Sequence, residues 1–188
     1  MAFTDGAAPR GLDDLKIVAL DGNDDPPIVD TNLIDVPGIR ALNFNVESNS
    51  DELEGDNSTI AIARDAKKVT GSVELGLMNL QALAKFQGGS VVTSGTTPDR
   101  IVYLEEDAQQ VTQYLQIMGQ SPDRRTSGAA YRVTIYKALV TSGPDESLTV
   151  NEWSTPTLDF EGTENPDGKL LRRTHFETGA DNPITLVP

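Results

Sequence analysis

The chain of 188 residues contains no cysteine and a single histidine, His175. Without cysteine there can be no disulfide, no thiolate metal site and no cysteine nucleophile. One imidazole also leaves little room for a histidine-rich metal centre. These two absences exclude several large classes of enzyme and metalloprotein.

Basic residues are scarce: 15 Lys and Arg stand against 29 Asp and Glu, which gives a net charge of −14. The imbalance is uneven, because residues 1–60 carry 13 acidic and 3 basic side chains. Tight binding of nucleic acid depends on neutralising phosphates, so this composition excludes a tight nucleic-acid binder. Composition leaves two interpretations open, namely solubility or salt adaptation, and repulsion of a polyanion.

Long hydrophobic runs are also missing. No stretch approaches the roughly 18 apolar residues of a membrane span. The first residues, MAFTDGAAPRGLDDLK, lack the apolar core of a signal peptide. The sequence therefore predicts a protein that is made and kept in the cytoplasm until something else moves it. Its length and its 37% hydrophobic content suit one domain with a real core.

Motifs for nucleotide binding and serine hydrolysis are absent. There is no G-x-S-x-G, no G-x-x-x-x-G-K-[ST] and no G-x-G-x-x-G. His175 lies within LLRRTHFE, where a surface histidine on a strand is the favoured interpretation. The segment DGNDDP, residues 21–26, begins like a calcium-binding loop, but Pro26 and Asn32 stand where that loop needs Gly and Glu. An ordinary turn is therefore expected there.

Carboxylates gather in two short segments, and paired carboxylates can hydrolyse glycosides. The members are Glu52, Glu54 and Asp56 in the first, and Glu105, Glu106 and Asp107 in the second. A catalytic pair would face across a cleft that aromatic side chains line, yet aromatics make up only 5% of the chain. Solvated loop acids are the better interpretation, and the sequence makes no case for an enzyme, a cofactor or a metal.

Alternation of apolar and polar residues is the main positive signal. Leu42, Phe44 and Val46 share one face of a predicted strand, and Leu158 and Phe160 share one face of another. In YRVTIYKALV, the same argument places Tyr131, Val133 and Ile135 together. A hairpin is predicted with Thr59–Arg64 against Val69–Met78, and loops are predicted over residues 48–58 and 88–100. Eight to ten strands predict a mainly β fold, an antiparallel β-sandwich.

One short helix is predicted near residues 79–87. Asn79 is a good N-cap, because its side-chain oxygen can accept an early backbone N–H. Leu80, Leu83 and Ala84 follow at helical spacing, and Gly88 and Gly89 can adopt the geometry that ends a helix. So short a helix must pack on something, either on a sheet of its own chain or between subunits.

The domain boundaries follow from turns and prolines. Residues 1–39 are rich in turn chemistry and are expected to form an N-terminal arm. Residues 40–180 are expected to form the β-sandwich. The segment NPITLVP follows a breaker, so residues 181–188 are expected to form a second arm.

The order of these elements resembles a known family. LEGDNSTIAIAR, residues 53–64, is similar to a turn and strand of the major tail proteins, or tail tube proteins, of long-tailed, siphovirus-type bacteriophages. In that family a second strand, a short helix rich in Leu and Ala, and Gly-Gly follow, as in KVTGSVELGLMNLQALAKFQGG, residues 68–89. The resemblance covers the chain from about residue 40 onward and implies a half-barrel of the tail-tube type.

The resemblance implies a structural virion protein rather than an enzyme. Such subunits form rings of six, and the rings stack into a hollow tube through which DNA is ejected. The implied partners are other copies of the chain, a tape measure protein, and tail terminator and distal tail proteins. DNA would pass without specific binding and no membrane would be involved. The implied location is the virion tail, after assembly in the bacterial cytoplasm.

Three sets of residues acquire expected roles from this resemblance. A tight turn is expected at Leu53, Glu54, Gly55 and Asp56. Some acids are expected to face the lumen and repel DNA, with Glu74, Glu105, Glu106, Asp107, Asp159 and Glu161 as candidates. The helix is expected to contact a neighbouring subunit or the chain's own sheet through Leu80, Leu83, Ala84 and Phe86.

Two other functions stay open at this point. One is a β-sandwich module that binds sugars or host proteins at a virion surface, although the low aromatic content disfavours it. The other is the tube protein of a contractile tail or of a type VI secretion system, which shares the fold.

Overall fold

The computed structural model describes residues 7–21, 33–48, 50–55, 58–64, 67–107, 112–125, 127–177 and 184. Over these residues the chain forms twelve strands and one helix, and all the strand pairs are antiparallel. The predicted mainly β fold with one short helix is therefore confirmed, although the strands outnumber the eight to ten expected.

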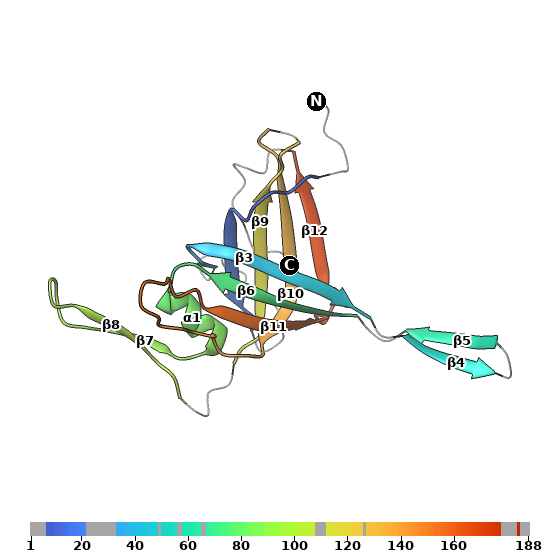
Figure 1. Ribbon diagram of the computed structural model, residues 1–188, viewed down its shortest axis with the longest axis horizontal. Helices are drawn as coiled ribbons and strands as arrows, with labels where there is room; N and C mark the ends of the chain where they lie inside the picture. Colours follow the sequence, from blue (N-terminus) through green and yellow to red (C-terminus); the bar gives the residue numbers. More distant parts are fainter. Residues whose placement is uncertain are drawn as a thin grey trace.

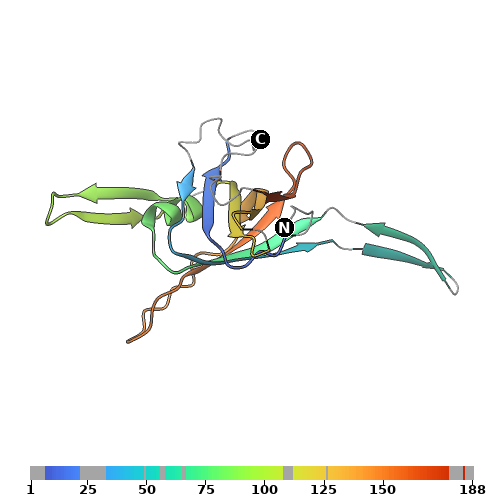
Figure 2. The ribbon, with the colours of Figure 1, turned by 90° about the horizontal axis from the view of Figure 1, so that it is seen from above.

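Eight strands form the main sheet, in the order β2-β1-β9-β10-β11-β6-β3, with β12 also paired to β10 (Figure 1). Their bounds are β1 (Asp14–Ala19), β2 (Ile34–Asp35), β3 (Ile39–Glu47), β6 (Lys68–Leu75), β9 (Leu115–Pro122), β10 (Ala130–Val140), β11 (Thr157–Thr163) and β12 (Leu171–Phe176). The helix is α1 (Leu80–Gln87). Two hairpins project at opposite ends of the body (Figure 2), namely β4 (Ser50–Gly55) with β5 (Ser58–Arg64), and β7 (Ser90–Ser94) with β8 (Ile101–Glu105).

Strand β10 is where the sheet folds over. Its residues 130–135 pair with β12, whereas residues 137–140 pair with β11. Its pairing with β9 shifts register between Ile135 and Ala138, and such irregularities bend a strand and increase its twist. As a result β3, β6 and β11 cross in front of β1, β9, β10 and β12 (Figure 1). The outcome is an open half-barrel with two layers.

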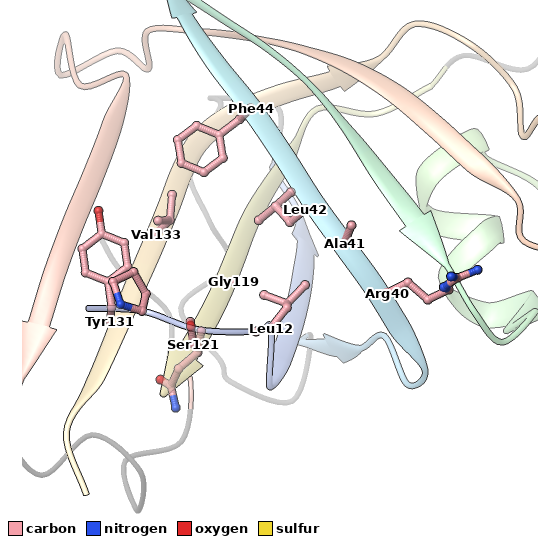
Figure 3. Close-up of a pocket in the computed structure, with 12 residues that line it drawn as sticks. Leu12, Arg40, Ala41, Leu42, Phe44, Gly119, Ser121, Tyr131 and Val133 are labelled. Carbon is pink, nitrogen blue, oxygen red and sulfur yellow. The ribbon is translucent and has the colours of Figure 1, made fainter. Parts of the chain in front are cut away.

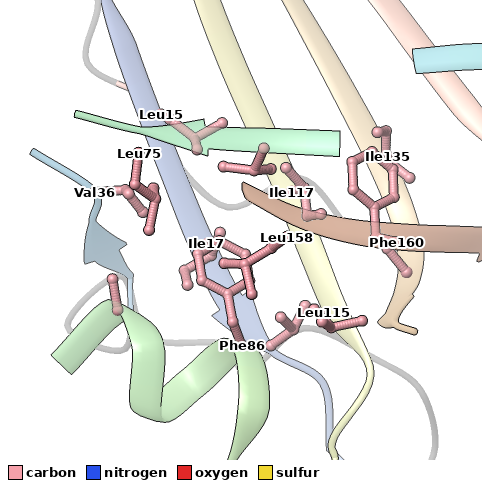
Figure 4. Packing of buried hydrophobic residues seen from close by; sticks show 14 of the residues in the cluster. Leu15, Ile17, Val36, Leu75, Phe86, Leu115, Ile117, Ile135, Leu158 and Phe160 are labelled. Atoms are coloured by element: carbon pink, nitrogen blue, oxygen red, sulfur yellow. The ribbon is translucent and has the colours of Figure 1, made fainter. Parts of the chain in front are cut away.

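The hydrophobic core lies between the two layers, and α1 closes one end of it (Figure 4). Leu15, Ile17 and Ile117 come from the back layer and Leu158 and Phe160 from the front layer, all at most 3% exposed. The predicted alternation in β11 is confirmed, since Asp159 between the two apolar residues is exposed. The predicted faces of β3 and β10 are confirmed too, because their apolar members pack in or against this core.

Helix α1 forms where it was predicted. The Asn79 side-chain oxygen accepts hydrogen bonds from the backbone N–H of Gln81 at 3.0 Å and of Ala82 at 3.4 Å. Gly88, at φ +86°, ends the helix. Leu83 and Phe86 are buried in the chain's own core, Leu80 packs against that core, and Ala84 is half-buried. The helix thus covers its own sheet, and a contact with a neighbouring subunit stays a prediction.

The predicted hairpin of Thr59–Arg64 with Val69–Met78 is wrong. Strand β5 pairs with β4, while β6 has β3 on one side and β11 on the other. The segment expected as a loop over residues 48–58 therefore contains β4, and the loop expected over residues 88–100 contains β7. Sequence proximity suggested β5 as the partner of β6, but the backbone of β6 pairs with β3 and β11.

Both terminal segments contact the main sheet: one contributes strands to it and the other packs a side chain against it. Within residues 1–39, β1 lies between β2 and β9, and Leu15 and Ile17 are fully buried. Near the other end, Ile184 packs with Val18 and Met118 in a second, smaller cluster. A role for either segment as an arm between copies stays a prediction.

Candidate interaction surfaces

A polar face covers β3, β6 and β11 on the side away from the core. The register aligns Asn43, Ser72 and Asp159 in one row across the three strands, and Asn45, Thr70 and Glu161 in the next row. Because side chains alternate along a strand, these rows point opposite to Leu158 and Phe160. We call this surface the polar face: Asn43, Asn45, Glu47, Lys68, Thr70, Ser72, Glu74, Thr157, Asp159 and Glu161.

Acids outnumber bases on the polar face. Lys68 Nζ lies 3.3 Å from Glu161 Oε1 and 4.0 Å from Glu47 Oε2. Arg40, next to the face, places Nη1 3.2 Å from Glu74 Oε1. Asp159 is exposed, and Ser142 Oγ donates to its carboxylate at 3.3 Å. Four carboxylates therefore stand against two cations, and the surface carries a negative field that salt screens only in part.

The six predicted lumen acids do not come together. Glu74, Asp159 and Glu161 lie on the polar face. Glu105 ends β8 opposite Ser90 at the base of the projecting β7–β8 hairpin, and Glu106 and Asp107 follow it, exposed. Only the first three share a surface within one chain, and a lumen position stays a prediction for all six.

The predicted turn at Leu53–Asp56 falls at the tip of the β4–β5 hairpin. Leu53 and Glu54 belong to β4, with a register shift between them, and Gly55 pairs with Ser58. Asp56 lies outside the described residues. The strand pairing fits a chain reversal after Gly55, but the predicted role of Asp56 stays a prediction.

The main sheet has open edges. Among the described strands, β2, β3 and β12 each have a paired neighbour on one side only. β3 is the longest of these, with nine residues and no proline. A long edge strand presents a row of backbone donors and acceptors and is a template for pairing with another chain.

An apolar groove of about 360 Å³ lies between β3 and the back layer (Figure 3). Leu42 and Phe44 of β3 point into it from one side, and Tyr131 and Val133 of β10 from the other. Gly119 of β9 forms part of its floor, and a Cβ there would lie 2.7 Å from Leu42 Cδ2. Absence of a side chain at this position therefore keeps the groove open.

The loop of residues 141–156, between β10 and β11, exposes three large apolar side chains. Leu148 is 90% exposed, Val150 84% and Trp153 95%. We call it the tryptophan loop, since Trp153 is the chain's single tryptophan. Neighbouring apolar groups this exposed are uncommon on a monomeric surface and mark interaction sites.

Sequence reasoning missed a buried pair of titratable groups. His175 Nε2 lies 2.9 Å from Asp123 Oδ2, with the side chains 11% and 0% exposed. His175 is on a strand as predicted, but its side chain is largely buried against Asp123 rather than solvated as expected. Hydrogen bonds from the backbone N–H groups of Arg125 and Ala8, both at 2.9 Å, hold the pKa of Asp123 below its usual value.

A second buried polar pair lies on the far side of the back layer. Arg132 donates from Nε and from Nη2 to Gln120 Oε1, at 3.0 and 2.7 Å, and its guanidinium stacks 4.6 Å from the centre of the Phe176 ring. Burial lowers the pKa of Arg132. Both faces of β10 are largely buried over its length. In the described part of the chain, no group of three or more potential metal ligands gathers.

Comparison with known proteins gives only remote likenesses. No family model and no curated protein matches the chain. Among solved structures, a chain of the native gene transfer agent virion is 14% identical with a TM-score of 0.40, over 86% of this chain and 95% of that one. A chain of the six-fold symmetrised baseplate of the anti-feeding prophage is 13% identical with a TM-score of 0.41, over 92% and 97%. Hcp1 from Salmonella typhimurium is 12% identical with a TM-score of 0.33, over 91% and 97%. At these TM-scores the likenesses carry no argument about what this chain does.

Proposed function

We propose that this chain is a structural subunit of the tail-tube type, which joins copies of itself into a hollow tube. The proposal rests on one layer of the sheet, which combines an open edge, an apolar groove and an acidic face. Among the described strands, β3 is an open edge of nine residues beside an apolar groove, and the opposite side of the same layer is polar and net acidic.

The open edge supplies the contact between subunits. When β3 pairs with a strand of a neighbour, its exposed backbone groups are satisfied and the sheet continues across the contact. When β3 meets a different edge of the neighbour, the contact is head-to-tail, and it closes a ring when its rotation divides the circle. A second head-to-tail contact along the axis stacks the rings into a tube.

The polar face then becomes the inner wall. Double-stranded DNA carries about one negative charge per 1.7 Å of its axis. A basic wall would bind it, whereas the acids of the polar face repel it over roughly 8 Å at physiological salt. Glu74, Asp159 and Glu161 are the side chains that we assign to this wall. A tube lined in this way lets DNA slide through.

The sequence resemblance refines the proposal. It favours rings of six in the tail of a siphovirus-type particle, with a tape measure protein inside and terminator and distal tail proteins at the ends. The role is architectural, so the chain's buried polar pairs serve stability rather than catalysis.

Electron microscopy of the purified, concentrated protein tests this function. Rings or hollow tubes are expected, with a sheet that runs continuously from β3 into the neighbouring copy. A control sample kept dilute should show single subunits, because assembly depends on concentration. Dispersed single particles at every concentration, salt and pH tried would contradict the proposal.

A further inference from the structure

We propose that the apolar groove beside β3 receives the tryptophan loop of a second copy, with Trp153 as the anchor. The identity of the second copy as the neighbour in a tube rests on the proposed function. The contact between groove and loop is a separate claim and can be measured without a tube.

The tryptophan loop is shaped to present its apolar residues. Asp145 pairs with Thr157 at its base, and the backbone N–H of Glu152 donates to the Thr149 carbonyl at 3.3 Å. Asn151 sits between Val150 and Trp153 at φ +67°, in the left-handed region that asparagine tolerates in turns. The tip is therefore a defined turn. A preorganised loop loses less conformational entropy when it binds than a flexible one does.

The groove matches an aromatic anchor in size and in chemistry. Its volume of about 360 Å³ falls within the range of sites that enclose small ligands. Phe44 and Tyr131 offer ring faces and edges to an incoming indole, and Leu12, Leu42 and Val133 offer aliphatic contacts. Tryptophan is enriched among the residues that dominate binding energy, and such residues seat in pockets of this kind.

Charge points to a second copy of the chain as the source of the occupant. The tryptophan loop carries Asp145, Glu146 and Glu152, and no Lys or Arg between residues 141 and 156. The guanidinium of Arg173 lies 5.7 Å from the centre of the Phe44 ring, at the edge of the groove. The other nearby arginine, Arg40, pairs its guanidinium with Glu74 at 3.2 Å. On a chain of net charge −14, most of the surface repels an acidic loop. Arg173 at the groove edge offsets this repulsion and selects the docking position.

The arrangement also explains how one contact can propagate. The groove lies near the Tyr131 end of β10, and the loop begins after Val140, at the other end of this bent strand. Figure 2 shows the loop projecting from the body (the orange-brown pair of chain segments at lower left), and Trp153 is 95% exposed in its own chain. Two distant, different patches make a head-to-tail contact, which extends from copy to copy.

The fluorescence of Trp153 reports the contact directly, because no other tryptophan contributes to the signal. On assembly, its emission should shift to shorter wavelength and become resistant to a soluble quencher. The variant Trp153→Ala should raise the concentration needed for assembly at least about 10-fold. Tubes in which Trp153 stays accessible to the quencher would overturn this inference and leave the proposed function intact.

A charge exchange tests the orientation of the loop. Arg173→Glu should weaken the contact roughly 2- to 5-fold, and adding Glu152→Arg should restore it. Arg172→Glu is the matched control, because Arg172 pairs with Thr134 and points to the opposite side of β12 from Arg173. Equal weakening by Arg172→Glu and Arg173→Glu, with no restoration by the double change, would overturn the assigned geometry.

A peptide experiment tests the contact between groove and loop independently of tube assembly. A synthetic peptide of residues 144–156 is titrated into the full-length Trp153→Ala chain, with the peptide's tryptophan as the probe. Saturable binding that Leu42→Asp abolishes supports the contact even if no tube forms, which would refute only the proposed function. No binding overturns the contact. Binding that requires prior removal of residues 1–6 assigns the groove to the chain's own N-terminus and also overturns it.

Discussion

His175 Nε2 lies 2.9 Å from Asp123 Oδ2, and this contact joins two residues that are 52 positions apart in the sequence. The same carboxylate accepts backbone hydrogen bonds from Ala8 and Arg125 through Oδ1. Asp123 therefore ties the N-terminal segment and the turn after β9 to strand β12. The carboxylate of Asp123 therefore helps to hold the N-terminal segment in place.

Asp123→Asn should destabilise the fold at neutral pH, because an amide cannot accept these hydrogen bonds with a full negative charge. The folded pKa of Asp123 is lowered, so its contribution is present above the unfolded pKa of about 3.9 and is lost as the pH falls through the folded value. Thermal unfolding as a function of pH should show the variant and the parent converging in acid. Asp167→Asn, at an exposed ion pair with Lys169, should leave the melting temperature unchanged.

The Asp123–His175 contact shows what a sequence cannot reveal. Asp123 stands in SPDRR, which reads as a polar turn, and His175 alternates along a strand like any surface residue. Asp123 and His175 come into contact because β12 and β9 both pair with β10, one on each side. Local patterns carry no information about such long-range register, so the burial of both side chains went unpredicted.

Phe86→Ala should cost about 3–5 kcal/mol of unfolding free energy, because Phe86 is fully buried between α1 and the sheet. Chemical denaturation measures this loss. Gln81→Ala changes an exposed position of the same helix and should stay within about 0.5 kcal/mol of the parent. A small effect of Phe86→Ala would contradict the placement of α1 on its own core.

Asn79→Ala should cost about 1 kcal/mol, because it removes the acceptor for two backbone N–H groups at the start of α1. The same denaturation experiment measures it. Asn79→Ser, which keeps a capping oxygen, should retain most of the stability. If serine and alanine prove equally destabilising, the cap is not the source of the effect.

Gly71→Ala should destabilise by about 1–3 kcal/mol through overpacking. A Cβ at Gly71 would lie 2.5 Å from Phe160 Cζ and still closer to the backbone oxygen of Asn43. Gly143→Ala is the matched control, since its new Cβ would meet only the Gln87 side chain, at 3.3 Å. Equal melting temperatures for the two variants would contradict the close approach of β3, β6 and β11.

Strong local signals were sufficient for part of the fold. The N-cap residue and the glycines after it correctly predicted α1, and period-two alternation correctly predicted the buried faces of β10 and β11. The choice of strand partners was predicted wrongly: β6 was assigned to its nearest neighbour in sequence, whereas it pairs with β3 and β11. The same limit applies to the polar face, whose acids were proposed individually but whose alignment depends on the register.

DNA should slide through the proposed tube of the parent protein. If the charge of the polar face is reversed, DNA should instead bind to the tube. The variant Glu74→Lys, Asp159→Lys, Glu161→Lys removes two exposed or half-exposed ion pairs, which contribute about 0–1 kcal/mol each, and the exposed hydrogen bond from Ser142 to Asp159. Its tubes should therefore still form, but retain double-stranded DNA at low salt and release it as salt rises. The control Glu105→Lys, Glu106→Lys, Asp107→Lys makes the same change in charge at the base of the β7–β8 hairpin, away from the polar face. Filter retention of labelled DNA by the two sets of tubes distinguishes a lumen position from a general effect of charge. If tubes of the polar-face variant retain no DNA at low salt, the polar face is not the inner wall.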